Sequence, residues 1–444
     1  MESGDCRSDS RGMSRLLWWI AATEEGSLYV LLFLLPFSKA AIEVTSVIWI
    51  VAWVIERLHP RGRANTVWLR KELRTVAFWL VAYLGACAVS TIVSDYPALS
   101  LKGFVGKWLQ YLFLFVVAAD LGSRVRVIDR TLRVIAASAC FVLVEAVTQE
   151  LLGRGIFRGF PRNIFGRMTG PYENPIDLAT YLMVISLILL TFALTQRRGK
   201  RLALAVLLGS LFLCLARTTA VGAWLGFGIG LAVVIIGYSG IRRYAPMFLG
   251  TLVLIGGFFL HRVGRLGRFF SLSDVGRVDR WAMWQAAIGM IRDRPLFGHG
   301  VNTFMANYLK YWVGGERQPR YAHSCYLQVA AETGVVGLVA FVGLLGAIGV
   351  QLCRGLQELT KEARLLLLGF SAGLLAFVVQ SGVDTNFYAL RQVALFWVLA
   401  GLAVGLSIKP TERSATGSKT AGKPQAIPMT ANVPLAELAA RDYA

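Results

Sequence analysis

The sequence has few charged residues for its length. They make up 16% of the 444 positions, whereas hydrophobic residues make up 56%, and the mean hydropathy is +0.57. Soluble domains carry about 25% charged residues. A chain this apolar needs a solvent other than water for most of its surface, which excludes a soluble globule.

Metal-binding and catalytic side chains are also scarce. The six cysteines are scattered without a Cys-x-x-Cys pair, so neither a disulfide framework nor a zinc site is supported. The four histidines do not cluster at metal-ligand spacing. No Asp-x-Asp occurs, which removes the usual carboxylates for a metal-bound nucleotide sugar, and no acidic pair for glycoside hydrolysis is evident. The sequence therefore predicts no metal and no cofactor.

Long apolar runs dominate what is present, and they predict an all-α, multi-pass membrane protein, because a spanning helix satisfies its own backbone hydrogen bonds. The expected spans are 16–36, 41–57, 75–94, 103–121, 131–151, 175–195, 201–216, 219–237, 245–261, 326–350, 364–383 and 387–407. The domain plan is a cytoplasmic N-terminus (1–15), nine spans within 16–261, a large periplasmic loop with amphipathic helices (262–325), three spans within 326–407, and a disordered cytoplasmic tail (408–444).

The net charge of +20 could mean nucleic acid in a soluble chain, but here the cations sort by loop. Alternate short loops are rich in Lys and Arg, as near Arg70, Arg126, Arg198 and Arg243. The positive-inside rule places these loops in the cytoplasm, and an even number of spans then places both termini there. Lipid phosphates, not nucleic acid, are the expected partners.

Two loops on the opposite side are unexpectedly rich in arginine: 152–174 and 262–325. Long loops translocate despite their charge, so a solvated basic surface near anionic headgroups is one reading. Nearly all of these cations are Arg, which binds phosphate bidentately. We favour a site for a phosphate or pyrophosphate group at the outer face.

Several residues in and near these loops can carry chemistry. In the large loop, the spacing of apolar residues predicts a helix over 277–294, ended by Pro295, with Arg277, Arg280 and Trp281 on one face. His323, where this loop re-enters the membrane, can act as a general base. Arg217, at the junction of two spans, either snorkels to the headgroups or forms an anion pocket with the start of the next helix.

An ordered set of motifs resembles the O-antigen ligase and polymerase superfamily. It comprises Gly276-Arg277 with Trp281, then Asp293 with Pro295-Leu296 and Gly298, then His323 with Tyr326-Leu327, then Glu332, Gly334 and Gly337; upstream stand Ala216-Arg217-Thr218 and the stretch 170–175. Departures are Ser324 where the family often has Asn, Ala216 where it often has Ser, and His299 at a usually apolar position, which favours a structural role for that histidine.

The resemblance implies a GT-C-like fold in the bacterial inner membrane and glycan transfer, without metal, from an undecaprenyl-pyrophosphate-linked donor. For a ligase the acceptor is lipid A–core oligosaccharide, and the site faces the periplasm. The resemblance implies His323 as general base and Arg217 and Arg277 as pyrophosphate ligands. Further candidate substrate-binding residues are Arg280, Arg162, Arg167, Arg265, Tyr172, Asn174 and Tyr326.

Three alternatives remain. A Wzy-type O-antigen polymerase and a protein O-oligosaccharyltransferase of the same superfamily differ from a ligase in their acceptor, which one sequence does not reveal. A polysaccharide-lipid flippase or transporter would be a different class. It predicts ionisable residues deep inside several spans and an internal repeat. The sequence has no convincing repeat, and its cations gather at one face instead.

Overall fold

The fold is described from a computed structural model, in which the described residues are 5–59, 66–163, 165–243, 246–247, 250, 253–254, 257–258, 275–314 and 318–408. They lie within one compact unit, Met1–Lys409. Within these ranges every regular element is a helix, apart from an isolated antiparallel bridge between Arg154 and Pro161. The described residues thus have the all-α class that the sequence predicts.

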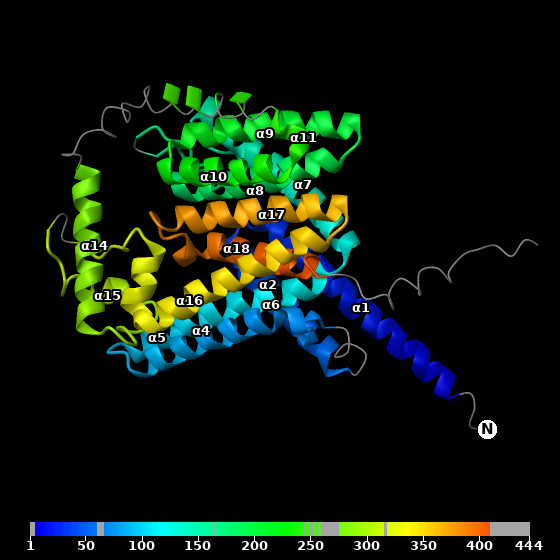
Figure 1. Cartoon of the computed structure of the whole chain (residues 1–444), viewed down its shortest axis with the longest axis horizontal. Helices are drawn as coiled ribbons and strands as arrows, with labels where there is room; N and C mark the ends of the chain where they lie inside the picture. The colour runs from blue at the N-terminus through cyan, green and yellow to red at the C-terminus, as the bar shows by residue number, and fades with distance from the viewer. Residues whose placement is uncertain are drawn as a thin grey trace, which may run out of the picture. The chain divides into compact units, whose positions relative to one another are not determined.

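The elements in chain order (Figure 1) are α1 (Asp5–Leu34), α2 (Lys39–Leu58), η1 (Val67–Leu69), η2 (Lys71–Leu73), α4 (Arg74–Ile92), α5 (Pro97–Gly103), η3 (Phe104–Leu109), α6 (Gln110–Gly122), α7 (Val125–Leu152), α8 (Pro175–Thr195), α9 (Arg198–Thr218), α10 (Val221–Gly237), α11 (Ser239–Arg242), α14 (Val275–Asp293), α15 (Phe304–Tyr308), α16 (Cys325–Glu358), α17 (Lys361–Gln380), η4 (Asn386–Tyr388) and α18 (Leu390–Leu406).

Seven helical stretches of the described residues are long and apolar enough to cross a membrane: Lys71–Ile92, Pro97–Gly122, Val125–Leu152, Pro175–Thr195, Arg198–Thr218, Cys325–Glu358 and Lys361–Gln380. Val221–Gly237 and Leu390–Leu406 are shorter apolar helices. The chain is therefore a multi-pass membrane protein. The expected spans 16–36 and 41–57 form α1 and α2, which carry more charge, and most of the expected span 245–261 lies outside the described residues. The count of twelve stays a prediction.

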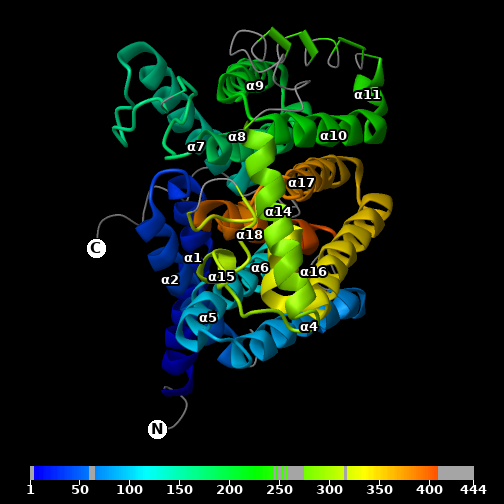
Figure 2. The same cartoon turned by 90° about the vertical axis from the view of Figure 1, so that its left-hand side faces the viewer.

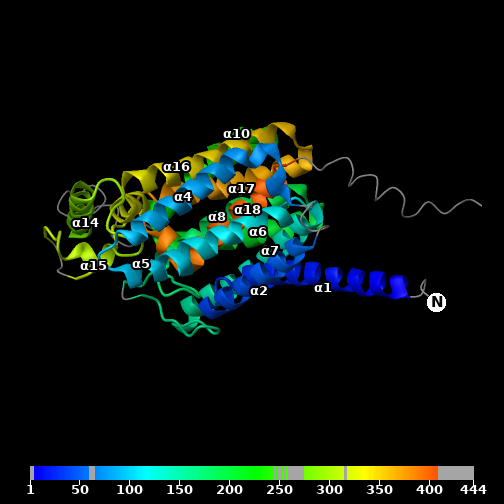
Figure 3. The same cartoon turned by 90° about the horizontal axis from the view of Figure 1, so that it is seen from below.

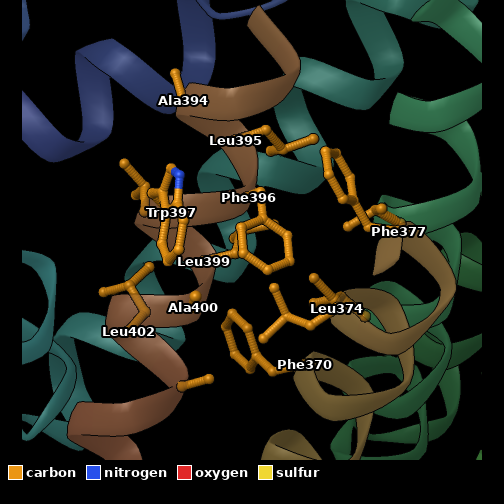
Figure 4. Close-up of a cluster of buried hydrophobic side chains, with 14 of the residues drawn as sticks. Phe370, Leu374, Phe377, Ala394, Leu395, Phe396, Trp397, Leu399, Ala400 and Leu402 are labelled. Atoms are coloured by element: carbon orange, nitrogen blue, oxygen red, sulfur yellow. The ribbon is translucent and has the colours of Figure 1, made fainter. Parts of the chain in front are cut away.

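The centre of the bundle is formed by α8, α17 and α18, which are buried along most of their length. Phe377 of α17 packs against Phe396 of α18, with ring centroids 4.8 Å apart, and Phe396 packs edge-on against Trp397 (Figure 4). On its other side α18 approaches α6 closely, because Gly401 and Gly405 face the α6 backbone: a Cβ at Gly401 would lie 2.4 Å from the Phe115 carbonyl oxygen. Small residues allow such close helix contacts in membranes.

The large loop is attached through a break in α16. Gly334 has φ 70° and ψ −174°, which interrupts the helix. The amides of Val335 and Val336 donate to the carbonyls of Pro295 and Leu296 instead, at 2.7 and 3.3 Å. The amides of His299 and Gly300 donate in turn to the carbonyls of Ala331 and Glu332. The two motifs that contain Pro295 and Gly334 are thus one interlocked structure.

Helix α14 lies across one end of the bundle, with α15 beside it (Figure 2). We call this the His323 end, because α16 begins there two residues after His323. In Figure 3 it lies opposite the end from which α1 extends. The buried face of α14 comprises Met283, Ala286, Ala287 and Met290. This face packs against Phe304 and Tyr308 of α15. Trp281, which the sequence places on one face with Arg277 and Arg280, is 58% exposed.

Candidate active site

Three of the predicted arginines meet near the end of α7. Arg217, in the last turn of α9, pairs with the carboxylate of Glu150 in α7, and Arg162 lies 3.5 Å from the same carboxylate oxygen. These side chains are about one-third exposed. Because exposed ion pairs contribute only about 0–1 kcal/mol, an incoming anion can replace Glu150 at small cost.

Arg167 fixes the loop 153–174 onto the turn between α9 and α10. Its side chain is buried, and its Nε donates to the Thr218 carbonyl at 2.7 Å. The Met168 amide donates to the Arg217 carbonyl at 3.4 Å. The turn itself is tight, since Thr219 takes the left-handed conformation with φ 50°. The sequence-predicted Arg162, Arg167 and Arg217 are therefore brought together, although Arg167 uses its Nε to hold backbone.

Gln149 of α7 supports the same loop from below. Its Oε1 accepts from the amides of Thr169 and Gly170 at 2.9 and 3.0 Å, and its Nε2 donates to the Phe160 carbonyl. This side chain is fully buried. One glutamine thus fixes two separate parts of the arginine-bearing loop, a role that sequence reasoning missed because a glutamine within an apolar run carries no spacing signal.

His323 faces a carboxylate that the sequence analysis did not select. Its Nδ1 lies 3.4 Å from Asp384 Oδ1, in the turn after α17. The Asp384 side chain is 10% exposed and that of His323 is 33% exposed. The Asp384 carbonyl also accepts from the Cys325 amide at 3.2 Å, which fixes this turn against the start of α16. A carboxylate at Nδ1 sets the tautomer in which Nε2 is the basic nitrogen. The distance is long for a hydrogen bond, as is common in catalytic sites without substrate.

The helix that follows the Arg217 turn contacts the segment that precedes Asp384. The first turn of α10, which follows the Arg217 turn, packs against the segment before Asp384: a Cβ at Gly222 would lie 2.9 Å from Val383 Cγ2 and 3.5 Å from Gln380 Cγ. Cations suited to an anionic leaving group thus stand at the same end of the bundle as a candidate base.

Other predicted residues have structural contacts. Asn174 caps α8, because its side-chain oxygen accepts from the Ile176 amide at 2.9 Å. The Tyr326 hydroxyl donates to the Val378 carbonyl of α17 at 2.8 Å. Tyr172 is buried beneath the guanidinium of Arg391. Arg280 is partly exposed on α14. Arg277 lies in the first turn of α14, but its side chain is not described, and Arg265 lies outside the described residues.

His299 and Asp95 are among the ionisable groups with shifted pKa values in the loops at this end. Burial lowers the pKa of His299, whose side chain is 2% exposed and whose Nε2 lies 3.1 Å from the Met290 carbonyl. A hydrogen bond from Arg294, 2.8 Å away, lowers the pKa of Asp95. A neutral, buried His299 fits the structural role expected for it. Among the described residues no three His, Cys, Asp or Glu side chains could hold a metal ion together.

Comparison with known proteins gives two matches. A protein of Rickettsia felis named "putative polysaccharide ligase" is 23% identical over 321 residues, which cover 65% of this chain and 74% of that protein. The family described as O-Antigen ligase matches residues 181–342. That range contains Arg217, Arg277 and His323 and ends eight positions beyond Gly334. The resemblance predicted from the ordered motifs is therefore confirmed: residues 181–342 of this chain are similar to the family described as O-Antigen ligase.

Proposed function

We propose that this protein is an O-antigen ligase, which transfers a glycan from undecaprenyl pyrophosphate to lipid A–core oligosaccharide at the periplasmic face of the inner membrane. The observation that supports the proposal is the contact of the first turn of α10 with the segment before Asp384, which puts the His323–Asp384 pair and the cluster of Arg162, Arg167 and Arg217 at the same end of the bundle. The family match supports glycosyl transfer in general.

The proposed reaction is a single displacement. His323 Nε2 takes the proton from an acceptor hydroxyl as its oxygen attacks the anomeric carbon of the donor. The bond from this carbon to the phosphate oxygen breaks, and undecaprenyl pyrophosphate leaves with the electron pair. Arg217 and Arg277 stabilise the negative charge on this leaving group. Attack opposite the leaving group inverts the anomeric configuration.

Asp384 supports this chemistry as a positioning residue. Hydrogen-bonded to Nδ1, its carboxylate orients the imidazole and stabilises the imidazolium formed when Nε2 is protonated. Arginine cannot act as the base at ordinary pH, so the division of roles follows from the residue types: histidine moves the proton, and arginines hold the anion.

The acceptor separates ligase from polymerase. Purified protein is supplied with lipid-linked donor, either with lipid A–core or with no second acceptor. A ligase attaches glycan to the core. When the core is omitted, a ligase does not elongate the lipid-linked glycan. Elongation of the lipid-linked glycan without core identifies a polymerase, and transfer to an added acceptor protein in place of core identifies a protein O-oligosaccharyltransferase.

The arginines are tested through donor saturation. Arg217→Gln and Arg277→Gln should lower kcat/KM for the lipid-linked donor by about 10- to 100-fold each, the range lost with one charge-assisted hydrogen bond. Arg133→Gln is the matched control, because Arg133 is exposed and paired with Asp129 within α7. Unchanged donor kinetics in both test variants contradict the pyrophosphate role. Added chelator should leave transfer unchanged, and inhibition reversed by added metal contradicts a metal-independent mechanism.

A further inference from the structure

A buried arginine outside the predicted set has one edge without a partner. Arg391, in the first turn of α18, is 5% exposed. Its Nη1 donates to the carbonyls of Pro36 and Pro171 at 3.1 and 3.0 Å. Its Nε and Nη2 are buried, and neither has a hydrogen-bond partner among the described residues. The guanidinium carbon lies 5.1 Å from the centroid of the Tyr172 ring.

The unpaired side of this guanidinium is the one that recognises anions. The Nε–H and Nη2–H groups point in parallel, so they can bind two oxygens of one phosphate or carboxylate. Within the described chain no carboxylate forms an ion pair with Arg391. Two backbone carbonyls and an aromatic face compensate only part of the cost of burying the charge. An anion at the free edge would compensate the remainder.

The surroundings of Arg391 also have unused hydrogen-bonding groups. The buried Tyr172 hydroxyl interacts with the Gln392 side chain, and Gln392 Oε1 is buried without a hydrogen-bond partner in the described residues. Two acidic residues, Glu173 and Asp177, interact with Arg391 through charge without forming an ion pair with it, and Glu173 pairs with Lys39 at 3.2 Å. These groups suit a polar ligand. Its oxygens would accept hydrogen bonds from Tyr172 and Arg391, and a hydroxyl group or a bound water would donate to Gln392 Oε1.

Arg391 lies beside the candidate active site. Asp177 interacts electrostatically with both Arg391 and Asp384, the partner of His323. The Pro171 turn that Arg391 holds follows directly on 167–170, where Arg167 and Gln149 fix the arginine-bearing loop. Arg391 thus holds the loop that carries the arginine cluster, and Asp177 interacts through charge both with Arg391 and with Asp384.

We propose that Arg391 is an anion-binding residue whose Nε–Nη2 edge takes a phosphate oxygen pair of a pyrophosphate group. Assigning this pyrophosphate to the lipid-linked donor rests on the proposed function. Because Nε and Nη2 are buried, binding requires groups around this edge to move. A phospholipid headgroup offers the same phosphate chemistry, so the experiment separates the two sources.

The test uses the full-length protein in nanodiscs of zwitterionic phosphatidylcholine, with inorganic pyrophosphate as the probe. Its Kd is measured from the rise in Tm for wild type, Arg391→Gln, Arg391→Lys and the control Arg133→Gln. We expect the Kd to rise on the order of 10- to 100-fold in Arg391→Gln and by a smaller factor in Arg391→Lys, which keeps the charge but loses the bidentate edge. A Kd within twofold of wild type in Arg391→Gln overturns the proposal.

Hydrogen exchange on the wild type tests the same claim even where a variant fails to fold. Pyrophosphate should slow amide exchange in peptides covering 169–178 and 386–395, and exchange unchanged in both segments overturns the proposal. Repeating the measurement in phosphatidylglycerol nanodiscs separates the sources: slowing by this lipid alone, with no further effect of pyrophosphate, assigns the edge to a headgroup and overturns the pyrophosphate assignment.

The two proposals fail separately. If Arg391→Gln weakens pyrophosphate binding but wild type transfers no glycan from a lipid-linked donor, the anion site stands and the proposed function fails. If wild type transfers glycan and Arg391→Gln keeps the wild-type Kd for pyrophosphate and the wild-type KM for donor, the proposed function stands and the anion site fails.

Discussion

At His323 the backbone takes a left-handed conformation, with φ 47°. Non-glycine residues seldom adopt positive φ, and where they do the strain often marks a functional site. In the described residues the others are Thr219, just after Arg217, and Asn302 in the large loop. All three belong to the His323 end of the bundle, so the backbone strain coincides with the candidate catalytic groups.

The Asp384 carboxylate gives a residue-scale prediction. Asp384→Asn should lower kcat by on the order of 10²- to 10⁴-fold with little change in donor KM, because the amide no longer stabilises the imidazolium. A variant with wild-type kcat would remove Asp384 from the mechanism.

The lowered pKa of His299 predicts how stability depends on pH. The unfolded chain takes up a proton below about pH 6.5, whereas the buried His299 resists protonation. Between its lowered pKa and 6.5 the unfolded state binds more protons, so stability falls as the pH falls through this window. The Tm should therefore drop between pH 7.5 and 5.5 by more in wild type than in His299→Gln. Equal drops contradict a neutral, buried His299. Asp95 does not interfere, because its ordinary pKa of 3.8 puts its effect at more acidic pH.

At the scale of elements, the break in α16 joins the large loop to the membrane bundle. Glu332, two residues before Gly334, accepts from the amide of Asn302 at 2.7 Å and from the Tyr388 hydroxyl at 3.1 Å. It thereby ties the segment before α15 to η4, which follows the Asp384 turn. The motif residues Glu332 and Gly334, selected from the sequence only by resemblance, thus hold the loop, and we assign them no chemical step.

Gly334→Ala tests this junction. A Cβ there would lie 2.1 Å from the Leu296 carbonyl oxygen, and φ is 70°. Strain and collision together should cost at least about 2 kcal/mol, seen as a lower Tm and lower yield of folded protein. Gly346→Ala on the same helix is the matched control, because nothing lies within 4 Å of its added Cβ; it should be neutral or slightly stabilising. Equal Tm values for the two variants would contradict the interlocked structure.

At the scale of the whole molecule, the sequence predicts what repeats locally and misses what depends on distant contacts. Apolar runs predict the helices, since a spanning helix satisfies its own backbone hydrogen bonds. The ordered motifs predict the resemblance to the family. Asp384 and Arg391 were not foreseen: each is a single polar residue near the last helices, 61 and 68 positions beyond His323, and only the packing of α17 and α18 brings them to the site.

The central claim is that His323 is the base for glycan transfer, and His323→Ala tests it most directly. In cells that depend on this protein, the variant should abolish attachment of O-antigen to lipid A–core while undecaprenyl-linked polymer accumulates. His59→Ala, after α2, is the matched control and should retain wild-type attachment. Attached O-antigen at the wild-type level in His323→Ala, with the protein present in the membrane in normal amount, would contradict the account.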